Sequence, residues 1–171
     1  MNVLVFSDSH GRVSYIDEMM KRAMACGGER SAHVLFLGDG LLDLARAREL
    51  DGRSVVAVRG NCDVLGADEP EARIIGLGKY RALMMHGHTQ GVKYGLTQAL
   101  AFAVRSEVDL LLFGHTHQPF AKELPKGEIY EGVHMPKRLC VFCPGALKDG
   151  CFGSIALTDG GILMSHGSLF D

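Results

Sequence analysis

The chain lacks several features that define other classes of protein. It has no charged segment followed by an apolar one and no apolar run long enough to cross a bilayer, so we expect a cytoplasmic protein without a membrane partner. Its formal net charge is only −2, which excludes the strong field that would recruit a stable nucleic-acid partner. It also lacks repeats, linkers and low-complexity tracts, and its 171 residues predict a single domain over 1–171.

A disulfide framework is absent as well. The five cysteines are odd in number and irregularly spaced, and we expect no signal peptide, which together argue against disulfides. Cys140 and Cys143 form a C-x-x-C pair, but they fall in a stretch that predicts a strand. An odd separation places the two thiols on opposite faces of a strand, so a shared zinc ion or a redox pair would need a bulge.

Periodicity predicts an alternation of strands and helices in the first two thirds of the chain. The order strand–helix–strand–helix–strand predicts parallel strands joined by right-handed crossovers. Strands are predicted at 3–6, 33–37, 54–58 and 108–113, a hairpin at 72–77 and 80–85, and helices at 13–27, 41–50 and 94–105. After Gln118 the pattern is all-β, with strands at 139–143, 153–157 and 162–166, and with 121–138 read as an extended hairpin or a flap.

Polar side chains gather where these strands end. In sheets of this kind the carboxyl ends of the strands share one rim, where ligands bind. The residues concerned are Asp8, His10, Asp39, Asn61, His86, His88, His115 and His117, and each turn includes or adjoins a glycine. Nitrogen and oxygen donors suit Mn, Fe, Co, Ni or Zn, and the donors are too many for one ion, so the pattern favours two ions sharing a carboxylate.

Each of these residues has a plainer interpretation when it is taken alone. Asp39 after a glycine can be an ordinary turn residue, and His86 and His88 can be core or surface histidines. The pair His115 and His117 has little packing value at a strand end, which favours a functional role. It is the whole ordered set that predicts a metal site.

The ordered motifs resemble those of the calcineurin-like metallophosphoesterase superfamily, and in particular its small single-domain bacterial and archaeal phosphodiesterases. The motifs are Asp8-x-His10, Gly38-Asp39, Gly60-Asn61-Cys62-Asp63, His86-Gly87-His88 and Gly114-His115-Thr116-His117. Cys143-Pro144-Gly145-Ala146 is similar to that branch's Asn-Pro-Gly-Ser turn. The resemblance implies a metallo-dependent phosphatase-like fold, which is a four-layer α/β/β/α sandwich of two mixed sheets with helices outside.

The resemblance also implies a ligand assignment. Asp8, His10 and His117 would hold one divalent ion, and Asn61, His86 and His115 would hold the other. Asp39 would bridge the two ions, and Asp39 and Asn61 would be the residues central to catalysis. We expect manganese, with Fe, Ni, Co or Zn as alternatives. A hydroxide between the ions would attack the phosphorus of a small phosphate ester.

Three further residues of the motifs are expected to contact substrate or to support the ligands. Cys62 stands where many members of the superfamily have a histidine that aids the leaving group. A thiol is a weaker proton donor than an imidazolium, so Cys62 favours phosphodiesters over monoesters. Asp63 is expected to accept a hydrogen bond from an imidazole. His86 is preferred to His88 as a ligand because it directly follows the strand.

A non-catalytic role is the alternative. One protein similar to this branch, a subunit of the eukaryotic retromer complex, has the same fold and serves as an interaction scaffold. Asp39, Asn61 and the two histidines of the Gly114–His117 motif retain the identities that a metal site needs, and this favours the enzyme. The exposed face of the β-rich second half could form a homo-oligomer. No motif indicates the natural substrate.

Overall fold

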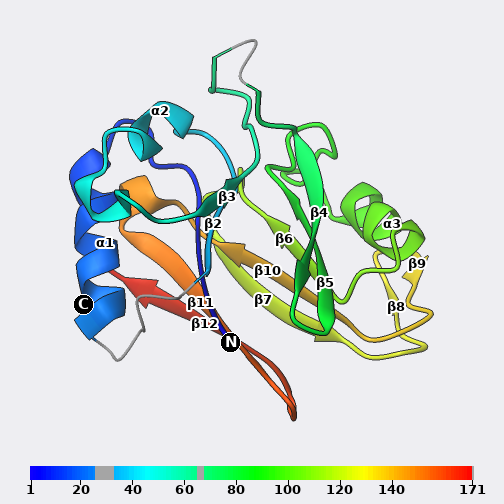
Figure 1. The fold of residues 1–171 in the computed structure, drawn as a ribbon. Coiled ribbons are helices and arrows are strands. Elements are labelled where there is room, and N and C mark those ends of the chain that lie inside the picture. Colours follow the sequence, from blue (N-terminus) through cyan, green and yellow to red (C-terminus); the bar gives the residue numbers. More distant parts are fainter. Residues whose placement is uncertain (26–32, 65–67, 171) are drawn as a thin grey trace.

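The protein is a sandwich of two five-stranded sheets with helices on both outer faces. The computed structural model describes residues 1–25, 33–64 and 68–170. Figure 1 shows α1 (Val13–Ala25) and α2 (Leu41–Leu44) outside one sheet and α3 (Thr97–Arg105) outside the other. The predicted four-layer α/β/β/α sandwich of two mixed sheets is confirmed.

The first sheet has the strand order β12-β11-β1-β2-β3. Its members are β1 (Asn2–Phe6), β2 (His33–Phe36), β3 (Val55–Ala57), β11 (Cys151–Thr158) and β12 (Gly161–Ser168). The first three strands are parallel to one another, as the crossover pattern predicts, and β11 pairs with β1 in the antiparallel sense. The opening strand of the chain therefore lies at the centre of its sheet.

The second sheet has the strand order β4-β5-β6-β10-β7. Its members are β4 (Ala72–Leu77), β5 (Tyr80–Met85), β6 (Leu110–Phe113), β7 (Pro119–Leu124) and β10 (Leu139–Pro144). The strands β5, β6 and β10 are parallel, and β4 and β7 are the antiparallel edges. The short pair β8 (Ile129–Tyr130) and β9 (Val133–His134) forms a hairpin, so the hairpin interpretation of 121–138 is confirmed.

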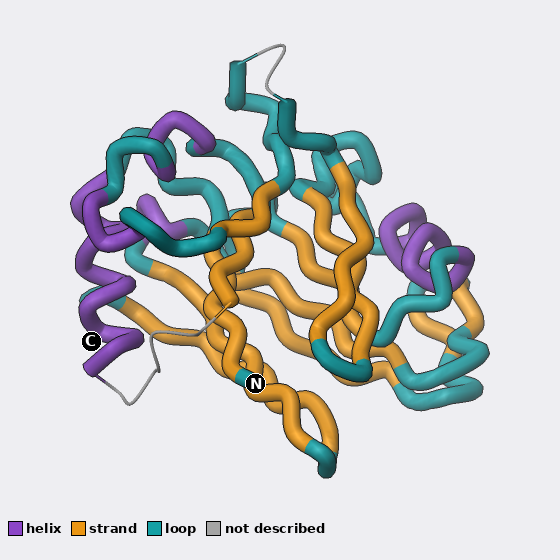
Figure 2. The backbone as a smooth tube through the Cα atoms, viewed as in Figure 1, coloured by secondary structure: helices purple, strands orange, loops and turns teal. Residues whose placement is uncertain are grey.

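Alternation along the strands divides the apolar side chains among three layers. In β1, Val3 and Val5 face the second sheet, while Leu4 and Phe6 face α1. In β10, Cys140 lies between the sheets and Cys143 lies on the outer face toward α3, so the two thiols point to opposite faces, as predicted. Figure 2 shows the strands stacked as two layers between the helices.

The structure differs from the predicted elements mainly around the second helix. The helix predicted over 41–50 is wrong: α2 ends at Leu44, and only the 3-10 turn η1 (Arg48–Leu50) follows. The reason is that Asp43, which a continuous amphipathic helix would expose, turns inward and is 4% exposed. The predicted end of the first helix, at Gly27, lies outside the described residues. Within the described parts of the chain, no helix is long and apolar enough to cross a membrane.

Backbone hydrogen bonds bring the strand ends of both sheets to one rim. The N–H of Asp8, after β1, donates to the carbonyl of Gly38 after β2 (2.9 Å). The N–H of Gly114, after β6, donates to the carbonyl of His86 after β5 (3.1 Å). A second 3-10 turn, η2 (Leu147–Asp149), joins the two groups, because its Leu147 N–H donates to the carbonyl of Ser7 (2.9 Å).

Candidate metal centre

The backbone at this rim adopts conformations that non-glycine residues rarely take. Seven non-glycine residues in the described chain have a positive φ, and five of them belong to the predicted ligand set. These five are Asp8, His10, Asp39, His115 and His117. Left-handed backbone at side chains of this kind stores strain, and such strain clusters at functional sites.

Glycine at two motif positions is required by a close approach between loops. A Cβ atom on Gly60 would lie 2.1 Å from the Oδ1 atom of Asp39. A Cβ atom on Gly38 would lie 2.7 Å from the amide nitrogen of Gly60 and 2.9 Å from the Nδ1 atom of His86. These glycines therefore let the loops after β2, β3 and β5 pack directly against one another.

The first cluster consists of Asp8, His10 and His117. The Nε2 atom of His117 lies 3.0 Å from the Oδ1 atom of Asp8, and the Nε2 atom of His10 lies 3.7 Å from the same oxygen. Asp8 is fully buried, whereas the side chains of His10 and His117 are 27% and 29% exposed. Their ligand atoms lie close enough together to bind one ion.

The second cluster consists of Asp39, Asn61, His86 and His115. The Nε2 atom of His86 lies 3.2 Å from the Oδ1 atom of Asn61 and 3.1 Å from the Nδ1 atom of His115. The same Nε2 atom lies 3.3 Å from the Oδ2 atom of Asp39. Within this cluster His86 and Asp39 are buried, His115 is partly buried and Asn61 is exposed.

The tautomer of His86 determines what the second cluster can bind. The Nδ1 atom of His86 lies 2.8 Å from the carbonyl oxygen of Leu37, which can only accept a hydrogen bond. When the imidazole is neutral, Nδ1 therefore carries the proton and Nε2 presents a lone pair. That lone pair faces a carboxylate oxygen, the amide oxygen of Asn61 and an imidazole nitrogen. Lone pairs that converge on one point in this way can bind a cation.

Asp39 lies between the two clusters. Its Oδ2 atom is 3.3 Å from the Nε2 atom of His86 and 3.8 Å from the Nε2 atom of His10. Its Oδ1 atom accepts a hydrogen bond from the backbone N–H of Cys62 (2.7 Å), which fixes the rotation of the carboxylate. The geometry is that of a carboxylate shared by two neighbouring sites.

Electrostatics keep the carboxylate of Asp39 ionised. Burial alone would raise the pKa of Asp39, but the hydrogen bond and charge of His86 and the N–H of Cys62 outweigh it and lower that pKa. Burial, together with the charges of His86 and Lys93, lowers the pKa of His115 to about 4. His115 is therefore a neutral imidazole near neutral pH, the form that binds metals.

The structure places His88 and Cys62 beside these clusters. The Nδ1 atom of His88 is buried without a hydrogen-bond partner in the described chain, and its Nε2 atom lies 3.9 Å from the Oε1 atom of Glu71. Cys62 is exposed, with its thiol near His10 and Asp39. Burial and the neighbouring Asp39 raise the pKa of Cys62, which keeps the thiol protonated.

Asp63 contacts the backbone and not an imidazole. Its Oδ2 atom accepts hydrogen bonds from the N–H groups of Asp39 (2.9 Å) and Gly60 (2.8 Å). Its Oδ1 atom accepts those of Gly40 and Leu41 (both 2.8 Å). The expected hydrogen bond from an imidazole is therefore replaced by four from the backbone, and the carboxylate stabilises the loop that carries Asp39.

One supporting residue, Asp43, was not predicted from the sequence. The Oδ2 atom of Asp43 accepts hydrogen bonds from the hydroxyl of Ser9 (2.6 Å) and the N–H of Gly11 (2.8 Å). These bonds enclose His10 and hold the loop after β1. The signal was the spacing of Asp43, four residues after Asp39, but the helix predicted over 41–50 placed its side chain in solvent.

Comparisons with known proteins identify the family to which the chain belongs. A family model described as the calcineurin-like phosphoesterase superfamily domain matches residues 1–159. A probable metallophosphoesterase of Bacillus subtilis, YsnB, is 33% identical over 68% of this chain and 64% of its own length, slightly less than two thirds. The phosphodiesterase YfcE of Escherichia coli is 26% identical over 95% of this chain and 96% of its own length.

Solved structures share the fold at low sequence identity. A predicted phosphoesterase from Streptococcus pneumoniae is 20% identical, with a TM-score of 0.72 over 98% of this chain and 88% of its own. A Vps29 variant from Entamoeba histolytica is 21% identical, with a TM-score of 0.64 over 99% of each chain.

Proposed function

Since the chain belongs to the calcineurin-like phosphoesterase superfamily, we propose that it is a metal-dependent phosphoesterase that hydrolyses phosphodiesters at a site for two divalent ions. The observation that carries the proposal is the convergence of nitrogen and oxygen donors around the Nε2 atom of His86, with Asp39 shared between two clusters. Arrangements of this kind suit in-line displacement at phosphorus.

The proposed ligand set consists of two groups of three residues and a seventh residue that both groups share. Asp8, His10 and His117 would hold one ion; Asn61, His86 and His115 would hold the other, with Asp39 between them. When bound, the ions would supply hydroxide near neutral pH and offset the charge of the phosphoryl oxygens. All these donors are nitrogen or oxygen atoms, which favours Mn²⁺, with Fe, Co, Ni and Zn as alternatives.

The chain's own residues hold these donors in place. Leu37 fixes the ring of His86 through its carbonyl, and Asp63 fixes the backbone of Asp39 through its carboxylate. Outer partners of this kind orient ligands and tune their basicity. His88 is proposed to lie beside the second ion as a neighbour of the ligands, because its Nε2 atom faces Glu71.

A preference for diesters is proposed from Cys62. A protonated thiol beside Asp39 is a poor acid for a developing alkoxide, so substrates with good leaving groups are favoured. The name of the related phosphodiesterase YfcE supports the same substrate class. The substrate would be a small phosphate ester.

The experiment compares two chromogenic esters. Metal-stripped protein would be assayed with bis-p-nitrophenyl phosphate and with p-nitrophenyl phosphate, each with and without Mn²⁺. We expect turnover only with the ion, and faster turnover of the diester. Faster turnover of the monoester would support phosphoesterase activity but would contradict the role proposed for Cys62.

The alternative is an interaction scaffold on the same fold. The structural likeness to Vps29 extends over the whole chain and leaves this alternative in place. Absence of turnover of either ester with Mn²⁺, Ni²⁺ and Zn²⁺ would favour the scaffold over the enzyme.

A further inference from the structure

Three charged or polar side chains meet beside the second cluster. Arg59 follows β3, Glu71 precedes β4 and His88 follows β5. The Oε1 atom of Glu71 lies 3.0 Å from the Nη2 atom of Arg59 and 3.9 Å from the Nε2 atom of His88. The N–H of Arg59 donates to the carbonyl of Pro70 (2.8 Å), which ties the end of β3 to the residue before Glu71. A guanidinium and an imidazole from two strand ends therefore lie next to one carboxylate oxygen.

This group adjoins the proposed metal ligands. The ring centroid of His88 lies 5.4 Å from that of His86 and 6.2 Å from that of His115. The carboxylate of Glu71 is thus linked to the second cluster through the ring of His88, and Arg59 lies on the other side of that carboxylate oxygen.

Both neighbours of Glu71 retain hydrogen-bonding capacity. A guanidinium has five N–H donors in a planar fork, and within the described chain the only acceptor bonded to that of Arg59 is Glu71. The Nδ1 atom of His88 is buried without a partner in the described chain, and its Nε2 atom lies beyond hydrogen-bond distance from Glu71. One carboxylate, held by a single hydrogen bond, leaves most of these groups unused.

A second ion pair close by in the sequence lacks this setting. Glu69 and Arg73 pair at 2.7 Å, with exposed fractions of 36% and 34%, and no described histidine forms an ion pair with Glu69. The Arg59–Glu71 pair is similarly exposed. What distinguishes it is the imidazole of His88, which borders the proposed ligands.

A carboxylate in this position resembles a bound anion. Carboxylate and phosphate groups both fit the planar fork of a guanidinium. A partly exposed ion pair is weak, so an anionic group of a ligand can displace Glu71 from Arg59. The same guanidinium would then serve the ion pair in the free protein and the ligand in the complex.

We propose that Arg59, beside His88, is a specificity-determining residue that binds a second anionic group of the ligand, and that Glu71 occupies this subsite when no ligand is bound. The ligand would be a phosphate ester that also carries a further phosphate or carboxylate group. This inference rests on the proposed function and narrows its substrate class.

Binding of two phosphonates to the Mn²⁺-loaded full-length protein tests the proposal without turnover. 3-Phosphonopropionate and propylphosphonate have carbon chains of the same length and the same phosphonate group, and they differ in a terminal carboxylate. R59Q should weaken binding of 3-phosphonopropionate by roughly tenfold, because charge-assisted hydrogen bonds are lost, and should leave propylphosphonate unchanged. Calorimetry would measure each dissociation constant.

Removing the competing carboxylate should have the opposite effect. E71A should tighten binding of 3-phosphonopropionate by about fivefold, because apparent affinity rises with the fraction of protein whose subsite is free. In the double variant R59Q/E71A this gain should vanish, since the guanidinium that Glu71 occupies is missing. An ion pair with a purely structural role would not give tighter binding when it is broken.

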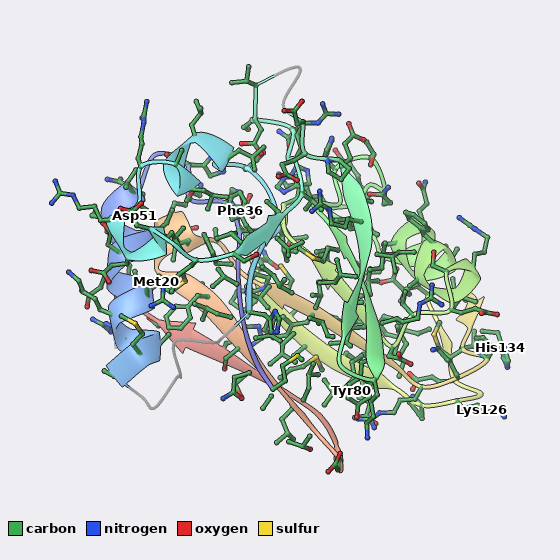
Figure 3. All side chains as sticks on the ribbon, in the orientation of Figure 1. Met20, Phe36, Asp51, Tyr80, Lys126 and His134 are labelled. Atoms are coloured by element: carbon green, nitrogen blue, oxygen red, sulfur yellow. The ribbon has the colours of Figure 1, made fainter. Side chains whose placement is uncertain are left out.

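Matched controls alter charges that lie outside the subsite. E69A and R73Q break the neighbouring ion pair, and K126Q removes a distant positive charge. Figure 3 shows Lys126 at the outer edge of the molecule; it follows β7, whose last residue Leu124 pairs with the first residue of β10, at the end of the sheet opposite the site. All three variants should bind both phosphonates like the unaltered protein. A gain in E69A equal to that in E71A would overturn the direct competition.

The outcomes separate the two proposals. Unchanged binding of 3-phosphonopropionate by R59Q and E71A would overturn the subsite, whatever the turnover of the unaltered protein. Equal effects on both phosphonates would overturn the role of the second anionic group. The expected selective changes together with no diester turnover would support the subsite and count against the phosphodiesterase.

Discussion

The two donor clusters at the rim differ in accessibility and in how firmly their atoms are held. In the first, His10 and His117 are partly exposed and share only the Oδ1 atom of Asp8. In the second, His86 is fully buried and its ring is fixed by the carbonyl of Leu37. The clusters therefore combine the same kinds of donor with different degrees of preorganisation.

This difference has a consequence for metal binding. A cluster whose central imidazole is buried and already oriented has less conformational entropy to lose when it binds an ion. We expect the second cluster to bind divalent ions more tightly, and the first cluster to exchange its ion with solvent more readily. The shared carboxylate of Asp39 would couple the two binding events.

The largest expected effect comes from removing that coupling. Asp39→Asn keeps the size of the side chain and an oxygen acceptor for the N–H of Cys62, but it removes the negative charge shared by both clusters. We expect diester turnover to fall by roughly a thousandfold or more, since loss of even one transition-state donor costs about 10²–10³. Mass spectrometry of the bound metal should show fewer than two ions per chain. If the variant bound two ions and kept full turnover, the proposed bridging role of Asp39 would be wrong.

A paired substitution would test the proposed order of affinities. His86→Gln should weaken the tightest Mn²⁺ site by about a hundredfold or more, whereas His10→Gln should weaken only the looser site, by about tenfold; changes even to outer partners of metal ligands cost about 10–100-fold. Competition with a fluorescent chelator would measure both constants. Equal effects of the two substitutions would contradict the distinction between the clusters.

Close packing under Asp39 offers a steric test. Gly60→Ala would place a methyl carbon 2.1 Å from the Oδ1 atom of Asp39, so the carboxylate has to move. We expect a loss of about 1–3 kcal/mol in the free energy of unfolding, as for other overpacked positions, together with weaker metal binding. Gly76→Ala in β4, where the added Cβ meets nothing within 4 Å, is the control. Urea denaturation would compare the two.

The smallest expected effect concerns the support of the exposed cluster. Asp43→Ala would leave the Ser9 hydroxyl and the Gly11 N–H without their acceptor, and so loosen the loop that carries His10. We expect about tenfold weaker Mn²⁺ binding at the first cluster alone, and a loss of stability of about 1–3 kcal/mol. Asp43→Asn, which retains an acceptor oxygen, should restore most of the Mn²⁺ affinity and most of the stability. Chelator competition and thermal unfolding would show whether the second cluster is also affected, which would contradict a local role.

The sequence predicted the layers and the neighbours in the site because the signals are local. Apolar runs such as 3–6 define the strands, and the rule that parallel strands end at one rim brings Asp8, Asp39 and His86 together. The preference for His86 over His88 as a metal ligand follows from its position directly after β5 and stays a prediction; the Nε2 atom of His86 lies within 3.2 Å of donors from Asn61 and His115.

Other features depend on contacts between distant segments and leave no local signal. Asp8 and His115 adopt left-handed backbone, which the sequence pattern around them did not predict. The inward turn of Asp43, which ends α2 at Leu44, is stabilised by a loop 34 residues earlier in the chain. Likewise, Asp63 is surrounded by backbone N–H groups whose arrangement only the folded loops create.

The central position of β1 also bears on how the chain acquires its site. Val3 pairs with Ile155 on one side, and the amino group of Met1 donates to the carbonyl of Leu157, 156 positions away. Contacts so distant in sequence form slowly, because the intervening chain must be ordered first. During synthesis β1, which leads into the loop with Asp8 and His10, leaves the ribosome well before β11, so its pairing is complete only when β11 has followed. A strand made early is thus secured only by a strand made late.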